Sequence, residues 1–197
     1  LPTDYDASTL TIRSSLQDVC FYVDGQLRVV YDTSDTRIAG KNSASRYVFC
    51  PTSSADAGKE MRIELTTHTG KYAGVVNTVF CGEKSEIWEY IFDSYGIATI
   101  IAFFLLFAGT VTVIFSIALG VVYHSKFDME YLGWCIIMAA GWMIGESKLR
   151  QLLVPNASVL STLCFVIIML CPLPIVYYID SMQNGRHQKV FRWMEYV

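Results

Sequence analysis

The thirty residues from Ser94 to Tyr123 carry no charged side chain. As an α-helix, residues 97–123 would be about 40 Å long, which exceeds the roughly 30 Å hydrocarbon core of a bilayer. A buried helix of a globular protein usually runs about 8 to 20 residues and keeps a polar stripe, whereas apolar side chains here cover every face. The apolar segment is too long and too far from the start of the chain to be a signal peptide. The sequence therefore predicts a membrane-spanning helix at about 95–123.

Two further apolar segments are predicted to be membrane helices, at about 129–153 and 157–181. The first reaches a spanning length only if its charged outer turns are included. The second follows Asn156, which can cap the unpaired amides of a helix start. Pro172 and Pro174 should kink its far end, and membrane helices tolerate such breaks where neighbours satisfy the freed carbonyl groups.

The chain looks cut at both ends. It begins at Leu1 without an initiator methionine, and residues 193–197 resemble the opening of another helix. We therefore expect a soluble domain over residues 1–88 that is incomplete at its N-terminus. Residues 89–197 would form a transmembrane region of three helices and the start of a fourth.

The orientation is predicted from lysine and arginine in the short loops, which are more frequent on the cytoplasmic side. With the soluble half outside, four such residues lie inside and two lie outside: Lys126, Arg186, Lys189 and Arg192 against Lys148 and Arg150. This difference favours a multi-pass protein of the cell membrane with an extracytoplasmic N-terminal half. The net charge of −3 gives no reason to expect nucleic acid as a partner.

The soluble half is patterned as β-structure. Short runs rich in β-branched and aromatic residues predict six strands, at 9–13, 19–24, 26–32, 46–50, 60–67 and 74–81. Asp24-Gly25 stands between two of these runs and predicts a two-residue hairpin, because a type I′ turn needs positive φ at both central positions. The expected fold is an all-β sandwich followed by transmembrane α-helices.

Three of the six cysteines precede the membrane region, so at most one disulfide bridge can form within this part of the chain. We interpret Cys50 and Cys81 as buried small apolar residues on strands and keep a bridge between them as the alternative.

Motifs of catalysis are absent from the sequence, including His-Glu-x-x-His, GxSxG, paired CxxC and a phosphate-binding glycine loop. His68, His124 and His187 are far apart, which is not the pattern of a metal site. We expect no catalytic residue, metal or cofactor in this part of the protein.

Candidate ligand-binding residues in the soluble half are Arg46 and Tyr72, which can hold sugars or carboxylates through bidentate hydrogen bonds and ring stacking. Alternation along the strand places Arg46 and Tyr47 on opposite faces. Trp88, with Tyr90 and Tyr95, is interpreted as an aromatic belt where the chain enters the bilayer.

Glu146, Lys148 and Arg150 are charged residues near a predicted membrane boundary. On a continuous helix Glu146 and Arg150 would be spaced i,i+4 and could form an ion pair that ends the second helix. The alternative is a relay that contacts the soluble domain or other helices, because ionisable residues at membrane depth are often functional.

Residues 10–31, LTIRSSLQDVCFYVDGQLRVVY, resemble the Asp-Gly hairpin of jelly-roll, carbohydrate-binding-like modules. With several helices after it, the chain resembles the bacterial seven-transmembrane receptors with diverse intracellular signalling modules. Residues 145–157, GESKLRQLLVPNA, are similar to those of bacterial sensor proteins that end in a diguanylate cyclase (GGDEF) domain. The GGDEF motif itself is absent from this sequence.

The resemblance implies a jelly-roll-like ectodomain that binds a small molecule such as a carbohydrate, a helical transducer and a cytoplasmic output domain beyond Val197. It also implies a homodimer, because GGDEF cyclases act as dimers. The alternative is a transporter or assembly subunit whose β-domain docks a partner protein. Transporters often carry broken helices in repeated halves, and only the Pro172 and Pro174 break is seen here.

Overall fold

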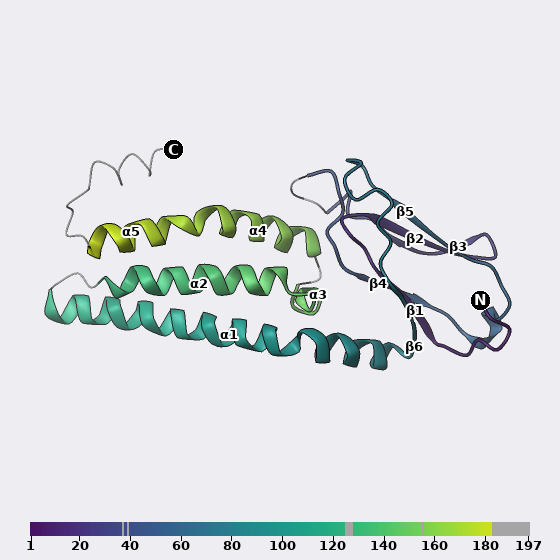
Figure 1. Ribbon diagram of the computed structural model, residues 1–197, viewed down its shortest axis with the longest axis horizontal. Helices are drawn as coiled ribbons and strands as arrows, with labels where there is room; N and C mark the ends of the chain where they lie inside the picture. Colours follow the sequence, from purple (N-terminus) through teal and green to yellow (C-terminus); the bar gives the residue numbers. More distant parts are fainter. Residues whose placement is uncertain (37, 39, 125–127, 155, 183–197) are drawn as a thin grey trace. The chain divides into compact units, whose positions relative to one another are not determined.

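The computed structural model describes residues 1–36, 38, 40–124, 128–154 and 156–182 (Figure 1). The chain divides into two compact units. The sandwich unit comprises Leu1–Gly96 and Lys148–Thr162, and the helical unit comprises Ile97–Ser147 with residues 163–182. The predicted start of a fourth helix lies outside the described residues, as do Lys126 and the basic residues after Met182.

The sandwich unit contains two three-stranded antiparallel sheets with the orders β4-β1-β6 and β3-β2-β5. The strands are β1 (Thr9–Arg13), β2 (Asp18–Val23), β3 (Gln26–Tyr31), β4 (Tyr47–Pro51), β5 (Met61–Thr66) and β6 (Val79–Gly82), and a short 3-10 helix spans Ser54–Asp56. The prediction of β-structure in this half is confirmed, and the structure shows that both sheets are antiparallel. The strands could be located in the sequence because apolar and polar residues alternate along them.

The hairpin between β2 and β3 turns at Asp24 and Gly25, whose φ angles are 53° and 77°. Both values are positive, as the predicted two-residue turn requires. Further along β3, Phe21 pairs with Val29 while Tyr22 pairs with Leu27, so Arg28 is the extra residue of a β-bulge.

The core of the sandwich lies between the two sheets. Leu10 and Ile12 of β1 and Val19 and Phe21 of β2 are at most 5% exposed and share this core with residues of β3 and β4. The apolar side chains of β5 pack against the same core, whereas Arg62 and Glu64 point to solvent. One face of each sheet is therefore buried against the other sheet.

The opposite face of the β4-β1-β6 sheet is covered by the first turns of α1 (Lys84–Tyr123). Ile87 and Ile91 are buried there, and the Trp88 ring stacks on Phe49 with centroids 5.3 Å apart. The helix thus begins eleven residues before the predicted start at 95. Ile87, Ile91 and Tyr95 recur every four residues, so this first part of the helix presents an apolar stripe to the sheet.

The sixth strand begins at Val79 rather than near Gly74. Gly74 has a φ of 80°, and Asn77 donates side-chain hydrogen bonds to Arg13 O and Ser15 Oγ. The residues before Val79 therefore form a loop that is tied to the end of β1.

Cys50 and Cys81 are both free and lie on opposite sides of Leu10 in the sheet. Two strand spacings separate them by about 10 Å, which is beyond the Cα distance that a disulfide allows. Cys50 is buried, as predicted, whereas Cys81 on the edge strand is exposed.

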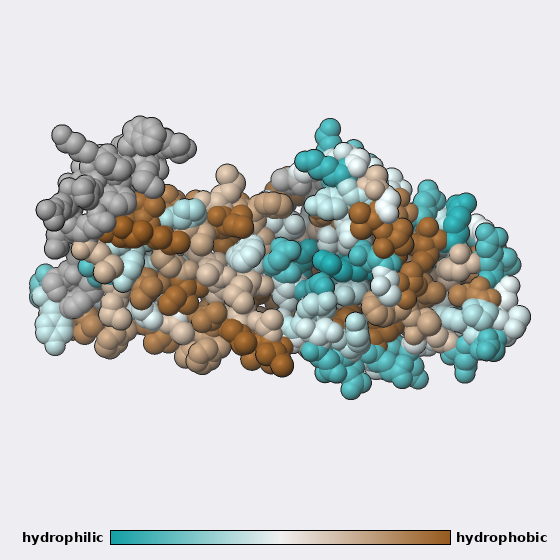
Figure 2. All heavy atoms as spheres, in the orientation of Figure 1, coloured by the Kyte–Doolittle hydropathy of each residue, from teal (hydrophilic) through white to brown (hydrophobic). Residues whose placement is uncertain are grey.

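The helical unit holds the rest of α1 together with α2 (Met129–Glu146), most of α4 (Ala157–Leu170) and α5 (Pro172–Met182). Among the described residues, two helical stretches are long and apolar enough to cross a membrane, Lys84–Tyr123 and Ala157–Met182. In Figure 2, hydrophobic residues dominate the visible face of these helices. The helix α2 has 18 residues, about 27 Å, and carries Glu130 and Glu146 near its ends.

Helices α1 and α2 approach closely at glycines. A Cβ atom on Gly133 would lie 2.6 Å from Val113 Cγ2, and one on Gly109 would lie 3.1 Å from the carbonyl oxygen of Gly133. Gly145 makes similar room for the side chain of Cys164 on α4. Small residues at such crossings are typical of helix packing in membranes.

The predicted helix at 129–153 is divided in the structure. α2 ends at Glu146 because Ser147 is extended, with φ −57° and ψ 137°, and its amide bonds the carbonyl groups of Met143 and Ile144. A short helix, α3, follows at Arg150–Leu153. Glu146 and Arg150 are therefore not spaced on one continuous helix.

Candidate functional site

The connection between α2 and α4, residues 147–156, enters the sandwich unit at Lys148. Leu149 is 4% exposed and joins the cluster formed by Tyr47 and the first turns of α1. Lys148 lies over the Tyr95 ring, with Nζ 3.8 Å from the centroid, and also donates to the Tyr95 hydroxyl. The connection is thus packed on the same sheet face as α1.

Polar side chains of this connection bind the backbone just before and at β4. Arg150 is buried, and its Nη2 donates to the carbonyl oxygen of Ser45 at 2.8 Å. The amide of Tyr47 donates to Gln151 Oε1 at 2.9 Å. Asn156 adds a weaker contact by donating to the carbonyl oxygen of Thr36 at 3.3 Å.

Residues 43–47, here called the shared segment, also hold the interior of the sandwich. The Tyr31 hydroxyl donates to the carbonyl oxygen of Ala44 at 2.5 Å, and the Arg46 guanidinium lies 5.3 Å from the Tyr31 ring centroid. The backbone of Arg46 is bonded to Ser14 on both sides, because its amide donates to Ser14 Oγ and its carbonyl accepts from Ser14 N. The shared segment therefore contacts the α2–α4 connection at Ser45 and Tyr47 and the sandwich interior at the other positions.

Polar side chains gather where the loops after β1, β3 and β5 meet. Ser43, fully buried, donates to Asp18 Oδ1 and accepts from Thr33 N and Thr33 Oγ1 at 3.0 and 2.9 Å. His68 Nε2 lies 2.7 Å from Asp18 Oδ2. The Asp18 side chain is 12% exposed, whereas that of His68 is 44% exposed, so His68 stands at the solvent side.

Two amides adjoin this group in the sequence, because Gln17 precedes Asp18 and Asn42 precedes Ser43. Gln17 is 2% exposed, and its Nε2 donates to the carbonyl oxygens of Tyr72 and Val75 at 2.8 and 3.2 Å. Asn42 Nδ2 donates to Thr69 Oγ1 at 2.8 Å. The oxygen atoms of both amides are buried without a hydrogen-bond partner. These side chains at the ends of the loops are called the loop-end cluster, which consists of Gln17, Asp18, Thr33, Asn42, Ser43 and His68.

Charges around the loop-end cluster act on Tyr31. Burial raises the pKa of Tyr31 to about 12, Arg46 and Arg150 oppose the rise, and Asp18 and Asp32 add to it. The phenol therefore stays protonated near neutral pH and remains a donor to the shared segment.

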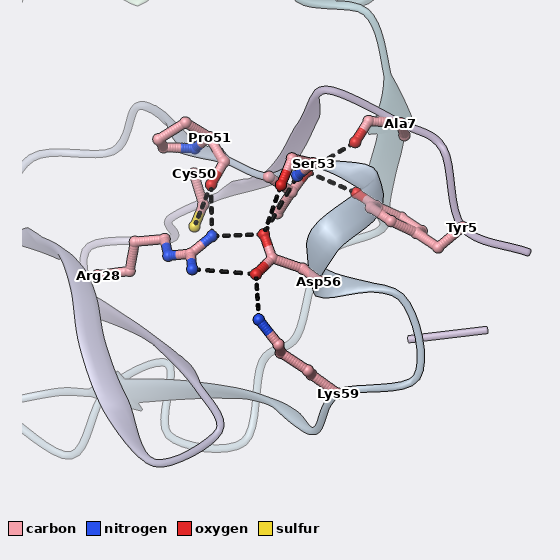
Figure 3. Close-up of polar contacts among 9 residues, drawn as sticks. Tyr5, Ala7, Arg28, Cys50, Pro51, Ser53, Asp56 and Lys59 are labelled. Carbon is pink, nitrogen blue, oxygen red and sulfur yellow. Dashed lines mark hydrogen bonds and ion pairs between the residues drawn. The ribbon is translucent and has the colours of Figure 1, made fainter. Parts of the chain in front are cut away.

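A second polar group joins the edges of the two sheets (Figure 3). The Arg28 guanidinium forms a bidentate pair with Asp56, at 2.6 and 3.1 Å, and donates to the carbonyl oxygen of Pro51. Lys59 and the amide of Ser53 also donate to Asp56. The hydrogen bond from Arg28, with those from Lys59 and Ser53, holds the pKa of the Asp56 carboxyl well below its ordinary value against the opposing effect of burial. We interpret this group as a structural tie, because each oxygen of the carboxylate is already paired.

The two predicted ligand residues lie in different environments. Arg46 covers the Tyr31 ring, and Tyr72 is exposed in the loop after β5 with a φ of 68°. Among the described residues, no hydrogen bond or ring contact joins Arg46 to Tyr72. Each is nevertheless linked to the loop-end cluster or its neighbour, Tyr72 through Gln17 and Arg46 through the shared segment.

The predicted aromatic belt packs on protein in part. Trp88 stacks on Phe49, the Tyr90 ring lies 5.3 Å from that of Phe80, and Tyr95 receives Lys148. These three rings are on α1 and lie on the sheet β4-β1-β6 or on the α2–α4 connection. That they also meet a bilayer interface stays a prediction.

The three predicted relay residues separate into two environments. Lys148 and Arg150 belong to the sandwich unit, where they contact Tyr95 and Ser45, and their role as a relay stays a prediction. Glu146 is exposed on the last turn of α2 in the helical unit.

Sequence reasoning missed Gln151 and the loop-end cluster. The residues of the loop-end cluster are common in loops and are spread over some fifty positions of the sequence. Neither spacing nor periodicity links Asp18 to His68. The one usable signal for Gln151 was its place next to Arg150 in a polar interruption of apolar helices.

Within the part of the chain that the structure describes, no group of three or more His, Cys, Asp or Glu side chains is arranged to hold a metal ion. Comparison of the chain with protein-family models finds no matching family, and comparisons with curated proteins and with solved structures find no match.

Proposed function

We propose that this chain is the sensory and transmembrane input region of a bacterial signal-transduction receptor. A small molecule binds the extracytoplasmic sandwich at the loop-end cluster, and the shared segment passes the change to the α2–α4 connection. The observation that carries the proposal is a pair of hydrogen bonds, in which Arg150 donates to the carbonyl oxygen of Ser45 and the amide of Tyr47 donates to Gln151.

The geometry supports transmission because the shared segment has contacts of two kinds. Ser43 is held by Asp18 and Thr33 of the loop-end cluster, and Ser45, two residues later, is held by Arg150. A ligand that changes the position of Ser43 must therefore displace or strain the bonds of Ser45 and Tyr47. Such a ligand shifts the equilibrium only by its differential affinity for the two states, about 1.4 kcal/mol for each tenfold difference.

The membrane location is supported by the two apolar helical stretches and by the chain segments that belong to the sandwich unit. That unit contains the start of α1 and the start of α4 as well as the α2–α4 connection. With α1 entering the bilayer and α2 returning, these three segments belong on the same side of the membrane. Lys148 and Arg150, the two outer charges that weaken the charge rule, are bound to Tyr95 and Ser45.

Hydrogen exchange of the full chain in lipid nanodiscs tests the transmission. Ser43→Ala removes the donor to Asp18 and the acceptor for Thr33, and we expect faster exchange at residues 148–154 as well as at residues 43–47. Ser54→Ala, an equally small change in the 3-10 helix at a distant turn, is the matched control and should leave residues 148–154 unchanged. Unaltered exchange at residues 148–154 in Ser43→Ala would contradict the proposal.

The output enzyme, the homodimer and the jelly-roll relationship of the sandwich remain predictions from the resemblance. A cytoplasmic diguanylate cyclase or kinase domain beyond Val197 is the expected readout. Sequencing the gene past this point tests it, and a second half that repeats the first would instead favour a transporter.

A further inference from the structure

We propose that the loop between β5 and β6, residues 67–78, rests on the bilayer surface and places Tyr72, Val75 and Val76 among the lipid headgroups. The contact attaches the sandwich to the membrane at a point outside the helices. This inference rests on the proposed membrane location, and it does not depend on which ligand the sandwich binds.

The first argument is the set of side chains that the β5–β6 loop exposes. Tyr72, Val75 and Val76 are 48%, 40% and 69% exposed, and they lie within five positions of one another. Exposed apolar side chains that occur together, unlike scattered ones, mark contact surfaces. The loop has no acidic residue, and Lys71 precedes Tyr72. Tyrosine is enriched at membrane interfaces, and a lysine there can extend its ammonium group to the water.

The second argument is that the sandwich fixes the backbone of this loop. Tyr72 has a φ of 68°, a left-handed conformation that bulky residues rarely adopt. Gln17, 2% exposed, donates to the carbonyl oxygens of Tyr72 and Val75 at 2.8 and 3.2 Å. Asn77 Nδ2 donates to the carbonyl oxygen of Arg13 at 2.6 Å. Because the loop is held in place, contact with a bilayer costs less ordering entropy than it would for a free loop.

The third argument is the end of the sandwich at which the loop lies. Arg13 is the last residue of β1 and pairs with Tyr47, the first residue of β4. The neighbouring strand β6 begins at Val79 on the same end of the sheet, which is called here the Arg13 end. The β5–β6 loop leads into Val79 and is bonded to Arg13 through Asn77, so it lies at the Arg13 end.

The helix α1 runs along the sheet toward the Arg13 end. It starts at Lys84, just after β6 finishes at the opposite end of the sheet. Its Trp88 ring stacks on Phe49 of β4. Tyr95, about two turns further along, packs against the cluster that contains Tyr47. The direction of the helix is therefore opposite to that of β6.

Both apolar helical stretches meet the sandwich at the Arg13 end. The uncharged stretch of α1 starts at Ser94, and the helix leaves the sandwich unit after Gly96. The connection that leads into α4 at Ala157 is bound by the hydrogen bond from Arg150 to the carbonyl oxygen of Ser45, just before β4. A bilayer that holds both stretches has its surface at this end, next to the exposed side chains of the β5–β6 loop.

The test uses the full chain, methyl-labelled at isoleucine, leucine and valine, in phosphatidylcholine nanodiscs. A lipid with a nitroxide at its headgroup broadens the NMR signals of methyl groups near the bilayer surface. We expect the signals of Val75 and Val76 to broaden several-fold more than those of Leu27. Leu27 is 54% exposed and is the matched control. It follows the hairpin turn after β2, a strand that starts at Asp18 beside Ser43 and runs away from the Arg13 end.

Two variants test whether the apolar side chains make the contact. Val76→Asp places a charge on an exposed side chain, and we expect the broadening at Val75 to fall by about half or more. Leu27→Asp makes the same change at the control position and should leave the broadening at Val75 unchanged. The signal of Ile12, which is 1% exposed in the core, reports whether each variant keeps the fold.

The measurement on the original chain decides the proposal without any variant. Broadening at Val75 and Val76 that does not exceed the broadening at Leu27 would overturn it. Undiminished broadening at Val75 in a folded Val76→Asp chain would do the same. If the signals of Val75 and Val76 instead change with the number of chains per nanodisc, the loop contacts a second copy and the proposal is wrong.

The loop contact and the proposed function fail separately. Ile100, 69% exposed on α1, reports the membrane location when the nitroxide is on the acyl chain. If Ile100 is broadened but Val75 and Val76 are not broadened by the headgroup nitroxide, the membrane location stands and the loop contact is wrong. If none of the three is broadened, both are wrong. If Val75 and Val76 are broadened and Ser43→Ala leaves exchange at residues 148–154 unchanged, the loop contact stands and the sensory function is wrong.

Discussion

Arg150 donates a hydrogen bond at 2.8 Å to the carbonyl oxygen of Ser45, which lies 105 residues earlier in the chain. The bond joins the segment between two helices to the backbone that leads into β4. Arg150 is buried and Ser45 is partly buried, so removal of the guanidinium leaves a carbonyl oxygen without this donor.

Arg150→Met should therefore destabilise the sandwich unit by about 1.5–3 kcal/mol, the usual range for a buried hydrogen bond to a charged group. Thermal and denaturant unfolding of the full chain in detergent measures the effect. Arg62→Met, at an arginine whose side chain is 63% exposed, is the control and should change stability by less than about 0.5 kcal/mol. Equal stabilities of the two variants would show that the Arg150 contact contributes little.

Asp56 should make stability depend on pH in acid. Its pKa in the folded state lies below the ordinary 3.8, so its ionised form stabilises the fold fully above about pH 4. This contribution is lost as the pH falls through the lower, folded-state pKa. Asp56→Asn should lower stability at neutral pH and flatten its dependence on pH below 4, measured by unfolding at several pH values.

Asp24→Asn is the matched control for this experiment, because asparagine suits the positive φ of the hairpin turn. The control should retain the acid dependence of the original chain. If the stability of Asp56→Asn fell as steeply in acid as that of the original chain, the acid dependence would come from other carboxylates.

Gly133→Ala should weaken the packing of α2 on α1. The added Cβ would meet Val113 Cγ2 at 2.6 Å, and overpacking of this kind costs about 1–3 kcal/mol. Gly141→Ala on the same helix is the control, because its Cβ would lie 3.4 Å from Ile167 Cδ1, an ordinary contact. The double variant Gly133→Ala with Val113→Ala should recover part of the lost stability in a detergent unfolding assay. If no stability is recovered, Gly133 does not pack against Val113.

The strands and the hairpin were predictable because their signals are local. Asp24-Gly25 requires a particular turn, and alternation of apolar residues identifies β5. The early start of α1 was missed because residues 84–94 are charged on one side, and their apolar stripe was not weighed against the sheet that it covers. The break at Ser147 was missed because its neighbours form good helices and only the contacts of Leu149 and Arg150 favour an interruption.

The loop-end cluster could not be predicted for a different reason. Serine, threonine, asparagine and glutamine in loops are usually solvated, and only the fold places Ser43 against Asp18 and Gln17 beneath the loop at Tyr72. Arg46 and Tyr72 were chosen for their chemistry, and the structure places both beside the cluster without joining them to each other.

The most direct test of the central claim is a double-mutant cycle between Ser43 and Gln151. Both side chains are uncharged. Ser43 begins the shared segment and Gln151 accepts a hydrogen bond from the amide of Tyr47 at its end, so the shared segment connects them. Ser43→Ala and Gln151→Ala are made singly and together in the full chain, and their unfolding free energies are compared. Ser43→Ala combined with Tyr5→Phe, which breaks a bond to Thr52 elsewhere in the sandwich, is the control cycle. The account predicts a coupling of about 0.5 kcal/mol or more for Ser43 with Gln151 and additive effects in the control. Additivity in both cycles would contradict it.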